Sequence, residues 1–146
     1  MSLNEDLFPQ LTSLLRQTLS SLLDPNAKLL LDMMAENVVF EFPYALPDGV
    51  QAVNGKQALA DYLLSVSGLI SLDSMTLQRC VLALEGNTAV LEFSGTGRLN
   101  KTGQPYHQRY ISVIEIKERL IVRYSDYWNP LALQSTHQQE GESHAE

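Results

Sequence analysis

Hydrophobic and polar residues alternate through the second half of the chain, and this period of two predicts β-strands. Four consecutive strands are expected at residues 75–85, 88–99, 106–117 and 120–128. Their connections are short: Gly86-Asn87, a loop at residues 100–105 containing Gly103, and a tight turn around Glu118-Arg119. Successive strands with short connections predict an antiparallel meander.

The first half of the chain repeats its hydrophobic residues every three to four positions, which predicts helices. A first helix, capped by Asn4, carries one stripe of Leu7, Leu11, Leu14, Leu15, Leu19 and Leu22, with Pro9 tolerated near its first turn. Asp24-Pro25 is expected to begin a second helix that ends near Asn37. The side chains of this second helix that would face the core are Leu29, Leu30, Met33 and Met34. A third helix follows Asn54-Gly55 and carries on one side Leu59, Tyr62, Leu63 and Val66.

A short strand and an irregular loop separate the second and third predicted helices. Residues 38–42 are β-branched and aromatic and end at Pro43, with Phe40 and Phe42 on one face and Glu41 on the other. Residues 44–54 follow Pro43 and hold Pro47 and Asp48-Gly49, which indicates a loop. Helices followed by a meander predict an α+β fold, with the helices packed on one face of a curved, mainly antiparallel sheet.

The last predicted strand has one face that is apolar apart from a single carboxylate. This face carries Leu120, Val122, Tyr124, Asp126 and Trp128, and the other carries Ile121, Arg123, Ser125 and Tyr127. An ionised carboxylate is costly to bury without partners, so Asp126 is the candidate functional residue. Desolvation on this face is expected to raise the pKa of Asp126.

The neighbouring strands extend this face into a predicted cavity. On residues 106–117, aromatic, small polar and apolar side chains share the inner face, and charged and aliphatic ones share the outer face. On residues 88–99, Leu91 and Phe93 point inward, whereas Glu92 and Arg98 point outward. The predicted lining is Phe40, Phe42, Phe93, Gln108, Tyr110, Ser112, Tyr124, Asp126 and Trp128. The orientation of residues 75–85 stays open.

Composition and charge narrow the class of protein. A chain of 146 residues with 45% hydrophobic residues suits one globular domain with a full core. A net charge of −7 argues against binding to nucleic acid or to an anionic membrane. One cysteine, Cys80, and the lack of a signal-peptide pattern favour a cytoplasmic location. Residues 134–146 lack an apolar period and predict a disordered polar tail.

Other reactive side chains have simpler interpretations. His107 begins a strand on its charged face, where a surface histidine is expected, and Cys80 is expected to fill core space. Arg109 and Glu92 are expected to form a cross-strand or interface ion pair. No spacing of His, Cys, Asp and Glu predicts a metal site.

These features together resemble one family. Helices before a strand that ends in Pro43, the Asn54-Gly55-Lys56 helix start, and a meander closing on YSDYWNPL (residues 124–131) resemble the SnoaL-like branch of the ketosteroid isomerase and nuclear transport factor 2-like superfamily. The YSDYWNPL ending is also similar to that of the phenazine-biosynthesis A/B enzymes. The resemblance covers roughly residues 4–133 and assigns residues 1–133 to one SnoaL-like domain.

The resemblance implies a cone-shaped α+β barrel with a deep apolar pocket, a homodimer, and no metal or organic cofactor. It also implies a small apolar, aromatic or polyketide-like ligand. The catalytic residues of ketosteroid isomerase do not carry over. Its general base corresponds to Phe42, its first-helix tyrosine falls near Thr18, and its second acid falls near Ile111 or Ser112. A pocket acid on the last strand, as in SnoaL-like cyclases, matches Asp126.

Two classes of function remain. The first is a cofactor-free isomerase, cyclase or dehydratase that acts on a small, largely apolar, oxygenated molecule and uses Asp126 for proton transfer. The second is a binding or dimerisation module that keeps the cavity without the chemistry. Dimerisation is expected through the outer sheet face, where the apolar residues would be Ile111, Val113, Ile121 and Tyr127.

Overall fold

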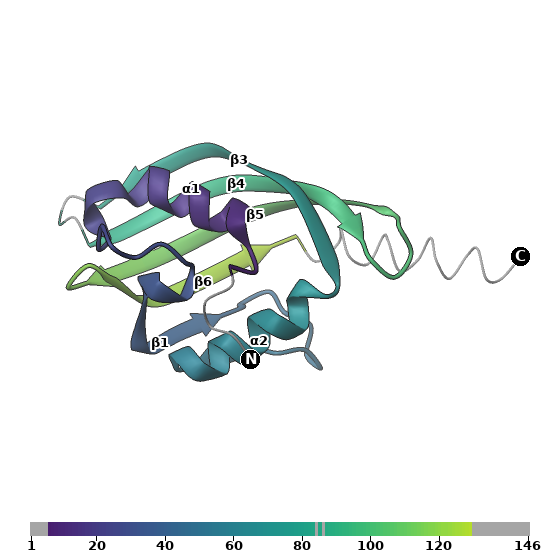
Figure 1. Cartoon of the computed structure of the whole chain (residues 1–146), viewed down its shortest axis with the longest axis horizontal. Helices are drawn as coiled ribbons and strands as arrows, with labels where there is room; N and C mark the ends of the chain where they lie inside the picture. The colour runs from purple at the N-terminus through teal and green to yellow at the C-terminus, as the bar shows by residue number, and fades with distance from the viewer. Residues whose placement is uncertain (1–5, 84, 86, 130–146) are drawn as a thin grey trace, which may run out of the picture.

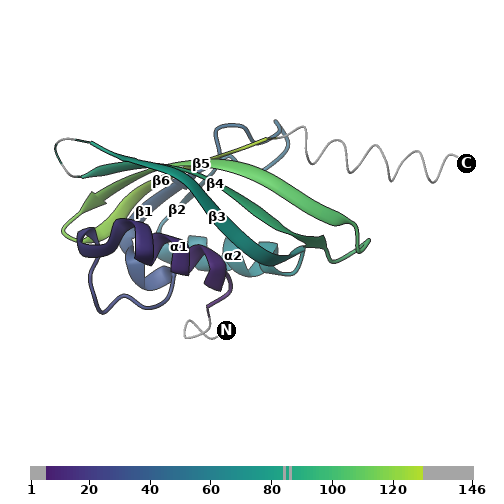
Figure 2. The same ribbon diagram turned by 90° about the horizontal axis from the view of Figure 1, so that it is seen from above.

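A computed structural model describes residues 6–83, 85 and 87–129 of this chain. Six strands form one open sheet in the order β2-β1-β6-β5-β4-β3, which arches over two helices on one face (Figures 1 and 2). The helices are α1 (Pro9–Leu19) and α2 (Lys56–Ser67), with short 3₁₀ helices η1 (Ser20–Leu22) and η2 (Leu31–Met33). The strands are β1 (Met34–Glu41), β2 (Ala52–Asn54), β3 (Ile70–Leu82), β4 (Thr88–Leu99), β5 (Pro105–Lys117) and β6 (Leu120–Trp128).

The predicted meander is confirmed. Strands β3, β4, β5 and β6 pair antiparallel in chain order. The bounds differ from the prediction in β3, which covers Ile70–Leu82 instead of residues 75–85, and at the start of β5, which is Pro105 instead of Tyr106. Strand β1 pairs with β6 in parallel and with β2 antiparallel. The fold is therefore α+β with a mainly antiparallel sheet. The sheet stays open, with β2 and β3 at its two edges.

The first and third predicted helices are present as α1 and α2. Pro9 occupies the first turn of α1, where the missing backbone N–H costs nothing, and the helix buries Leu14, Leu15 and Leu19. Helix α2 follows Gly55, whose φ of 93° lies in the left-handed region that glycine tolerates. The predicted Asn4 cap, the Pro130-Leu131 end of YSDYWNPL and the predicted tail lie outside the described residues.

The prediction of a second helix at residues 25–37 is wrong. The carboxylate of Asp24 accepts from the backbone N–H of Asn26 (2.9 Å), which closes a local turn. The backbone N–H of Asp24 donates to the carbonyl of Arg119 (3.1 Å) in the distant β5–β6 turn. The chain then makes only the η2 turn before β1 begins at Met34. Tertiary pairing with β6 overrides the helical spacing of the leucines and methionines.

A bulge near the start of β6 changes which residues face inward. Glu115 pairs with Arg123, but the next residue of β5, Ile116, pairs with Ile121, so the alternation breaks at Val122. Ile121 is consequently 0% exposed and belongs to the core. The expectation that Ile121 lies on the outer face is wrong. Beyond the bulge, Tyr124, Asp126 and Trp128 face inward as predicted.

A second irregularity bends β3 around β4. The register shifts between Leu72 and Ser74, opposite Gly97 and Thr96. A Cβ on Gly97 would collide with the backbone of Ser71, so only glycine permits this close approach. The bend carries the end of the sheet over α2. Ile70, Leu72 and Met75, on either side of the bend, line a cavity between the sheet and the helices. Among the described residues, no helix is long and apolar enough to span a membrane.

Candidate functional site

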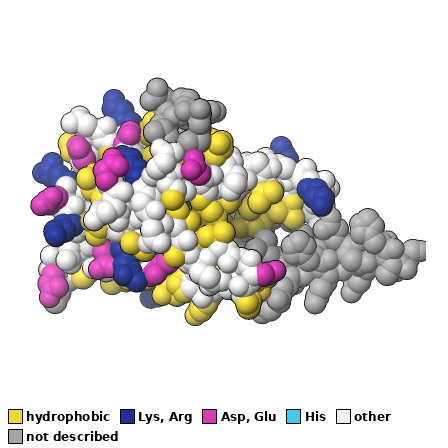
Figure 3. Space-filling model, turned by 90° about the horizontal axis from the view of Figure 1, so that it is seen from below, with side chains coloured by type: hydrophobic (Ala, Val, Ile, Leu, Met, Phe, Trp, Pro, Cys, Tyr) yellow, Lys and Arg dark blue, Asp and Glu magenta, His cyan; other side chains and the backbone are white. Residues whose placement is uncertain are grey.

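A cavity of about 260 Å³ lies between the inner face of the sheet and the two helices. Helix α1 and the segment before it contribute Phe8 and Leu11, and α2 contributes Tyr62, Leu63 and Val66. Residues of β1, β3, β4, β5 and β6, together with Phe42 after β1 and Leu69 before β3, form the rest of the wall. On the face shown in Figure 3, hydrophobic side chains gather around a hollow, whereas acidic and basic side chains concentrate at the left of the view. The volume is near the lower end for small-molecule sites, roughly 300–1,000 Å³.

Aromatic rings make up much of the cavity wall. All four phenylalanines, four of the six tyrosines and the single tryptophan line it. Phe42 lies 5.2 Å from Trp128 and 5.0 Å from Tyr62 between ring centroids. Phe40 stacks on Tyr124 at 4.3 Å. These separations lie in, or just below, the range of favourable aromatic pairs, about 4.5–7 Å, so the rings hold one another in place.

Asp126 is the acidic residue in this aromatic wall. It lies on β6 opposite Ser112 of β5. Its Oδ1 atom is buried and has no hydrogen-bond partner among the described residues. Burial disfavours the carboxylate form and raises the pKa of Asp126 from 3.8 to about 7. The predicted direction of the pKa shift is therefore found, and the group can exchange a proton near neutral pH.

Tyrosine hydroxyls supply most of the other polar atoms near Asp126. The hydroxyls of Tyr106 and Tyr110 are 2.8 Å apart, and Tyr124 accepts a hydrogen bond from Ser112 at 2.8 Å. Burial and, to a lesser extent, the charge of Asp126 raise the pKa of Tyr62 on α2. Burial also raises the pKa values of Tyr106, Tyr110 and Tyr124. These phenols are therefore neutral donors and acceptors over the ordinary pH range.

Eight of the nine residues predicted for the cavity line it: Phe40, Phe42, Phe93, Gln108, Tyr110, Tyr124, Asp126 and Trp128. Ser112 does not, because it is fully buried and its hydroxyl is bonded to Tyr124. The amide of Gln108 is engaged with the backbone: its Oε1 accepts from Arg109 and Asn129, and its Nε2 donates to Asn129. Gln108 thus ties β5 to the end of β6. The roles of the nine predicted residues in binding a ligand stay predictions.

Two tyrosines of the site are missing from the sequence-based list. Tyr106 falls on the predicted inner face of its strand, and it lines the cavity with its hydroxyl on Tyr110. Tyr62 falls on the apolar side of the predicted third helix, and it packs against Phe42. A tyrosine at an otherwise apolar helical or strand position is the available signal, because its hydroxyl needs a polar partner when buried.

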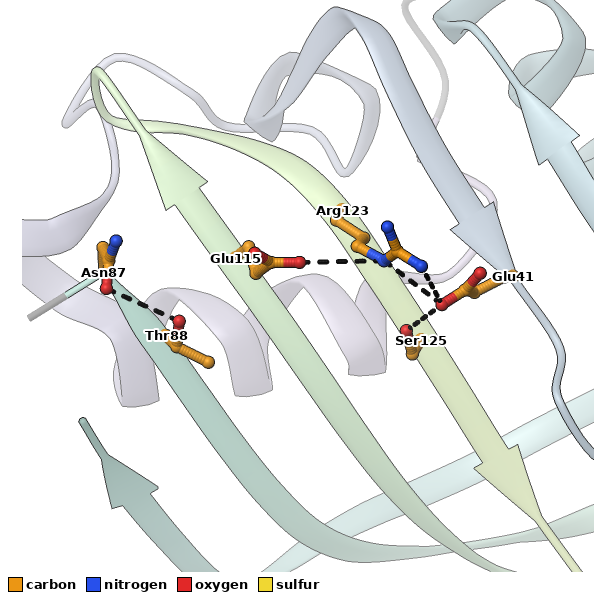
Figure 4. Close-up of polar contacts among 6 residues, drawn as sticks. All are labelled: Glu41, Asn87, Thr88, Glu115, Arg123 and Ser125. Atoms are coloured by element: carbon orange, nitrogen blue, oxygen red, sulfur yellow. Dashed lines mark hydrogen bonds and ion pairs between the residues drawn. The ribbon is translucent and has the colours of Figure 1, made fainter.

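The charged candidates lie outside the cavity, on the outer face of the sheet. Glu92 forms ion pairs with Arg79 at 2.7 Å and with Arg109 at 3.7 Å, which confirms the predicted cross-strand pairing. On the same face, Glu41 of β1 accepts hydrogen bonds from Arg123 and Ser125 of β6 (Figure 4). His107 is exposed. None of these residues lines the cavity.

The position that corresponds to the base of ketosteroid isomerase carries no acid. Phe42 lines the cavity and is 2% exposed, so its ring occupies that place. No group of three or more His, Cys, Asp and Glu side chains suited to a metal occurs in the described part of the chain. Cys80 packs against the core, and burial raises the pKa of its thiol. Proton exchange at Asp126 is the chemistry that this geometry supports.

Comparison with known proteins shows the family. The model of the SnoaL-like domain matches residues 15–124. An uncharacterised protein of Bacillus subtilis, YesE, is 39% identical over 133 residues, which are 91% of this chain and 89% of that protein. The chain therefore belongs to the SnoaL-like family, as its motifs predict.

Two further relatives agree with this assignment. An uncharacterised PhzA/B-like protein of Pseudomonas aeruginosa is 29% identical over 68% of this chain and 70% of its own length, so the predicted phenazine-type likeness is confirmed. A crystal structure named "Putative Isomerase" from Bacillus subtilis is 37% identical. It covers 90% of this chain and 94% of its own, with a TM-score of 0.72.

Proposed function

We propose that this protein is a cofactor-free isomerase- or cyclase-like enzyme for a small, largely apolar, oxygenated molecule, with Asp126 as general acid and base. One observation carries the proposal: a carboxylate whose Oδ1 lacks a partner among the described residues faces an aromatic cavity, and its pKa is about 7. A structural carboxylate would instead be expected to accept hydrogen bonds that stabilise its charge.

A pKa near neutrality suits both halves of a proton-transfer reaction. The carboxylate takes a proton from a carbon next to a carbonyl, and the electrons of the C–H bond move into an enolate. The resulting carboxylic acid returns that proton to a second carbon, so the substrate is isomerised with no net change in composition. The phenols of Tyr106 and Tyr110 supply hydrogen bonds to oxygen atoms of the substrate.

The wall of the cavity limits the class of substrate. Its rings favour flat or compact apolar groups, and its polar atoms are few. An aromatic or polyketide-like carbonyl compound of modest size meets both conditions. The cavity of about 260 Å³ excludes extended chains unless they project toward its opening.

Proton exchange tests the proposal without knowledge of the natural substrate. Cyclohex-2-enone and related small ketones are incubated with the protein in D₂O, and loss of their α-proton signals is followed by NMR. Exchange should be faster than in buffer alone, and Asp126→Asn should slow it by about 10²–10⁴-fold, the usual contribution of a general acid–base group. The rate should rise as the carboxylate ionises, with an apparent pKa of about 7.

Glu41→Gln provides a matched control, because it also removes one carboxylate but on the opposite face of the sheet. It should leave exchange unchanged. Exchange that is equal in wild type and Asp126→Asn would contradict the catalytic role. Ketones that bind at Asp126 without exchange would favour the second class of function, a binding module.

A further inference from the structure

Asp126 is a negative group on the cavity wall without a positive partner among the described residues. Those of them that line the cavity include no Lys, Arg or His. A carboxylate that loses water on burial needs a counter-charge or hydrogen bonds, or else it is driven toward its protonated form. The unpartnered Oδ1 shows that the described residues do not supply this compensation to that atom. A cationic ligand would supply it.

The rings around Asp126 are suited to the same kind of ligand. Phe42, Tyr62 and Trp128 form a continuous wall, with centroid separations of 5.0 and 5.2 Å, and Trp128 follows Asp126 by two positions on the same face of β6. The faces of aromatic rings attract cations, tryptophan most strongly, and clusters of such rings recognise substituted ammonium groups. The alkyl groups of such a ligand also gain from leaving water.

We propose that the cavity selects ligands carrying an ammonium group with apolar substituents, with Asp126 as the counter-ion and Phe42, Tyr62 and Trp128 around the alkyl groups. The inference rests on the proposed function of the cavity and names the class of its ligand. A bound cation favours the carboxylate form of Asp126, which is the form that acts as a base. Binding of a cation would also explain why a carboxylate is present in an otherwise apolar wall.

The groups that face Asp126 allow a clean pH test. They are Tyr62 from α2, Tyr106 and Tyr110 from β5, and Tyr124 from β6, and each has its pKa raised above the usual value for a phenol. Among the described residues of the lining, Asp126 alone therefore changes charge between about pH 5 and pH 8. A quaternary ammonium ligand does not titrate, so any pH dependence of its affinity reports on the protein.

Choline and its neutral carbon analogue 3,3-dimethylbutan-1-ol are the probes, because they share size, shape and hydroxyl group and differ in charge. Their affinities are measured by NMR titration of the purified protein. At about pH 8, choline should bind roughly tenfold more tightly than the alcohol, as expected for a cation held by rings and a carboxylate. At about pH 5 most of this preference should be lost, which leaves the smaller part that the rings supply, and the affinity for the alcohol should stay constant.

Two substitutions separate the contributions. Asp126→Asn should lower the preference for choline to its value at about pH 5, make it independent of pH and spare binding of the alcohol, whereas Glu41→Gln should change neither affinity. Trp128→Leu should weaken choline binding by about threefold or more and affect the alcohol less. Equal affinity of the two probes for wild type at about pH 8 would overturn the inference, as would a choline preference that Asp126→Asn leaves undiminished.

The failures of the two proposals are distinguishable. If the probes bind equally and Asp126→Asn still abolishes ketone proton exchange, the cationic ligand is wrong and the catalytic role stands. If choline binding depends on Asp126 and proton exchange does not, the site is a binding site for cations without general-base chemistry.

Discussion

The two faces of the sheet give two carboxylates, Glu41 and Asp126, opposite hydrogen bonding and opposite pKa shifts. On the outer face, Glu41 accepts hydrogen bonds from Ser125 at 2.6 Å and from Arg123 at 2.9 and 3.2 Å (Figure 4). The Ser125 bond is the main cause that lowers the pKa of Glu41. On the inner face, Asp126 follows Ser125 directly in the chain, yet its Oδ1 has no partner within the described residues and its pKa is raised.

The contrast shows that side-chain direction, and not position along the chain, sets the chemistry of these acids. Ser125 and Asp126 are adjacent, but alternation on β6 sends one toward Glu41 and the other into the cavity. The outer carboxylate stabilises the fold in its charged form. The inner carboxylate opposes folding when it is charged, which is a cost expected at functional sites and unusual at structural ones.

The largest effect should appear in the pH dependence of unfolding. The folded-state pKa of Asp126 is about 7, above its ordinary 3.8, so the folded protein binds more protons between these values and loses stability as pH rises through that window. The loss between about pH 5 and pH 7.5 should be roughly 2 kcal/mol. Asp126→Asn should remove it. Urea titrations of both proteins measure the difference, and parallel pH profiles would show that folding does not raise the pKa of Asp126.

A second prediction concerns association of the outer face, where Ile111 is 43% exposed between charged neighbours. We expect a homodimer through this face, which would bury Ile111, Val113 and Tyr127. Ile111→Glu should weaken association by about 2 kcal/mol, or roughly 30-fold, because it places a charge in the interface. Sedimentation at micromolar concentration measures it, with Glu115→Gln as a milder control. A monomeric wild type would refute the dimer.

The smallest effect should come from the outer carboxylate, with the opposite sign to that of Asp126. Because the pKa of Glu41 is lowered, its contribution is present above the unfolded value of 4.5 and is lost as pH falls through the folded value. Glu41→Gln should cost about 1 kcal/mol or less at neutral pH, since the ion pair with Arg123 is partly exposed. Thermal unfolding measures this cost. An unfolding temperature that is unchanged at every pH would remove the contrast between the two faces.

The sequence could predict most of the sheet because period-two alternation is a local property of each strand. It placed β4 and β6 at their observed bounds and put Leu91, Phe93, Tyr124, Asp126 and Trp128 on inner faces. It could not predict the loss of the second helix, since helical and strand spacing look alike over a short apolar run and pairing of Met34 with Ile121 decided between them.

By itself, then, the sequence determined the α+β class, the meander and the carboxylate on an aromatic strand face, because each follows from spacing along one segment. Only the tertiary structure decided which atoms meet. The bulge at Val122 directs Ile121 into the core. The hydroxyl of Ser112 bonds to Tyr124 and does not line the cavity, whereas Tyr62 of α2 does. Register and burial depend on contacts between distant segments, so the lack of a partner for Oδ1 of Asp126 among the described residues emerges only after the strands and helices have packed.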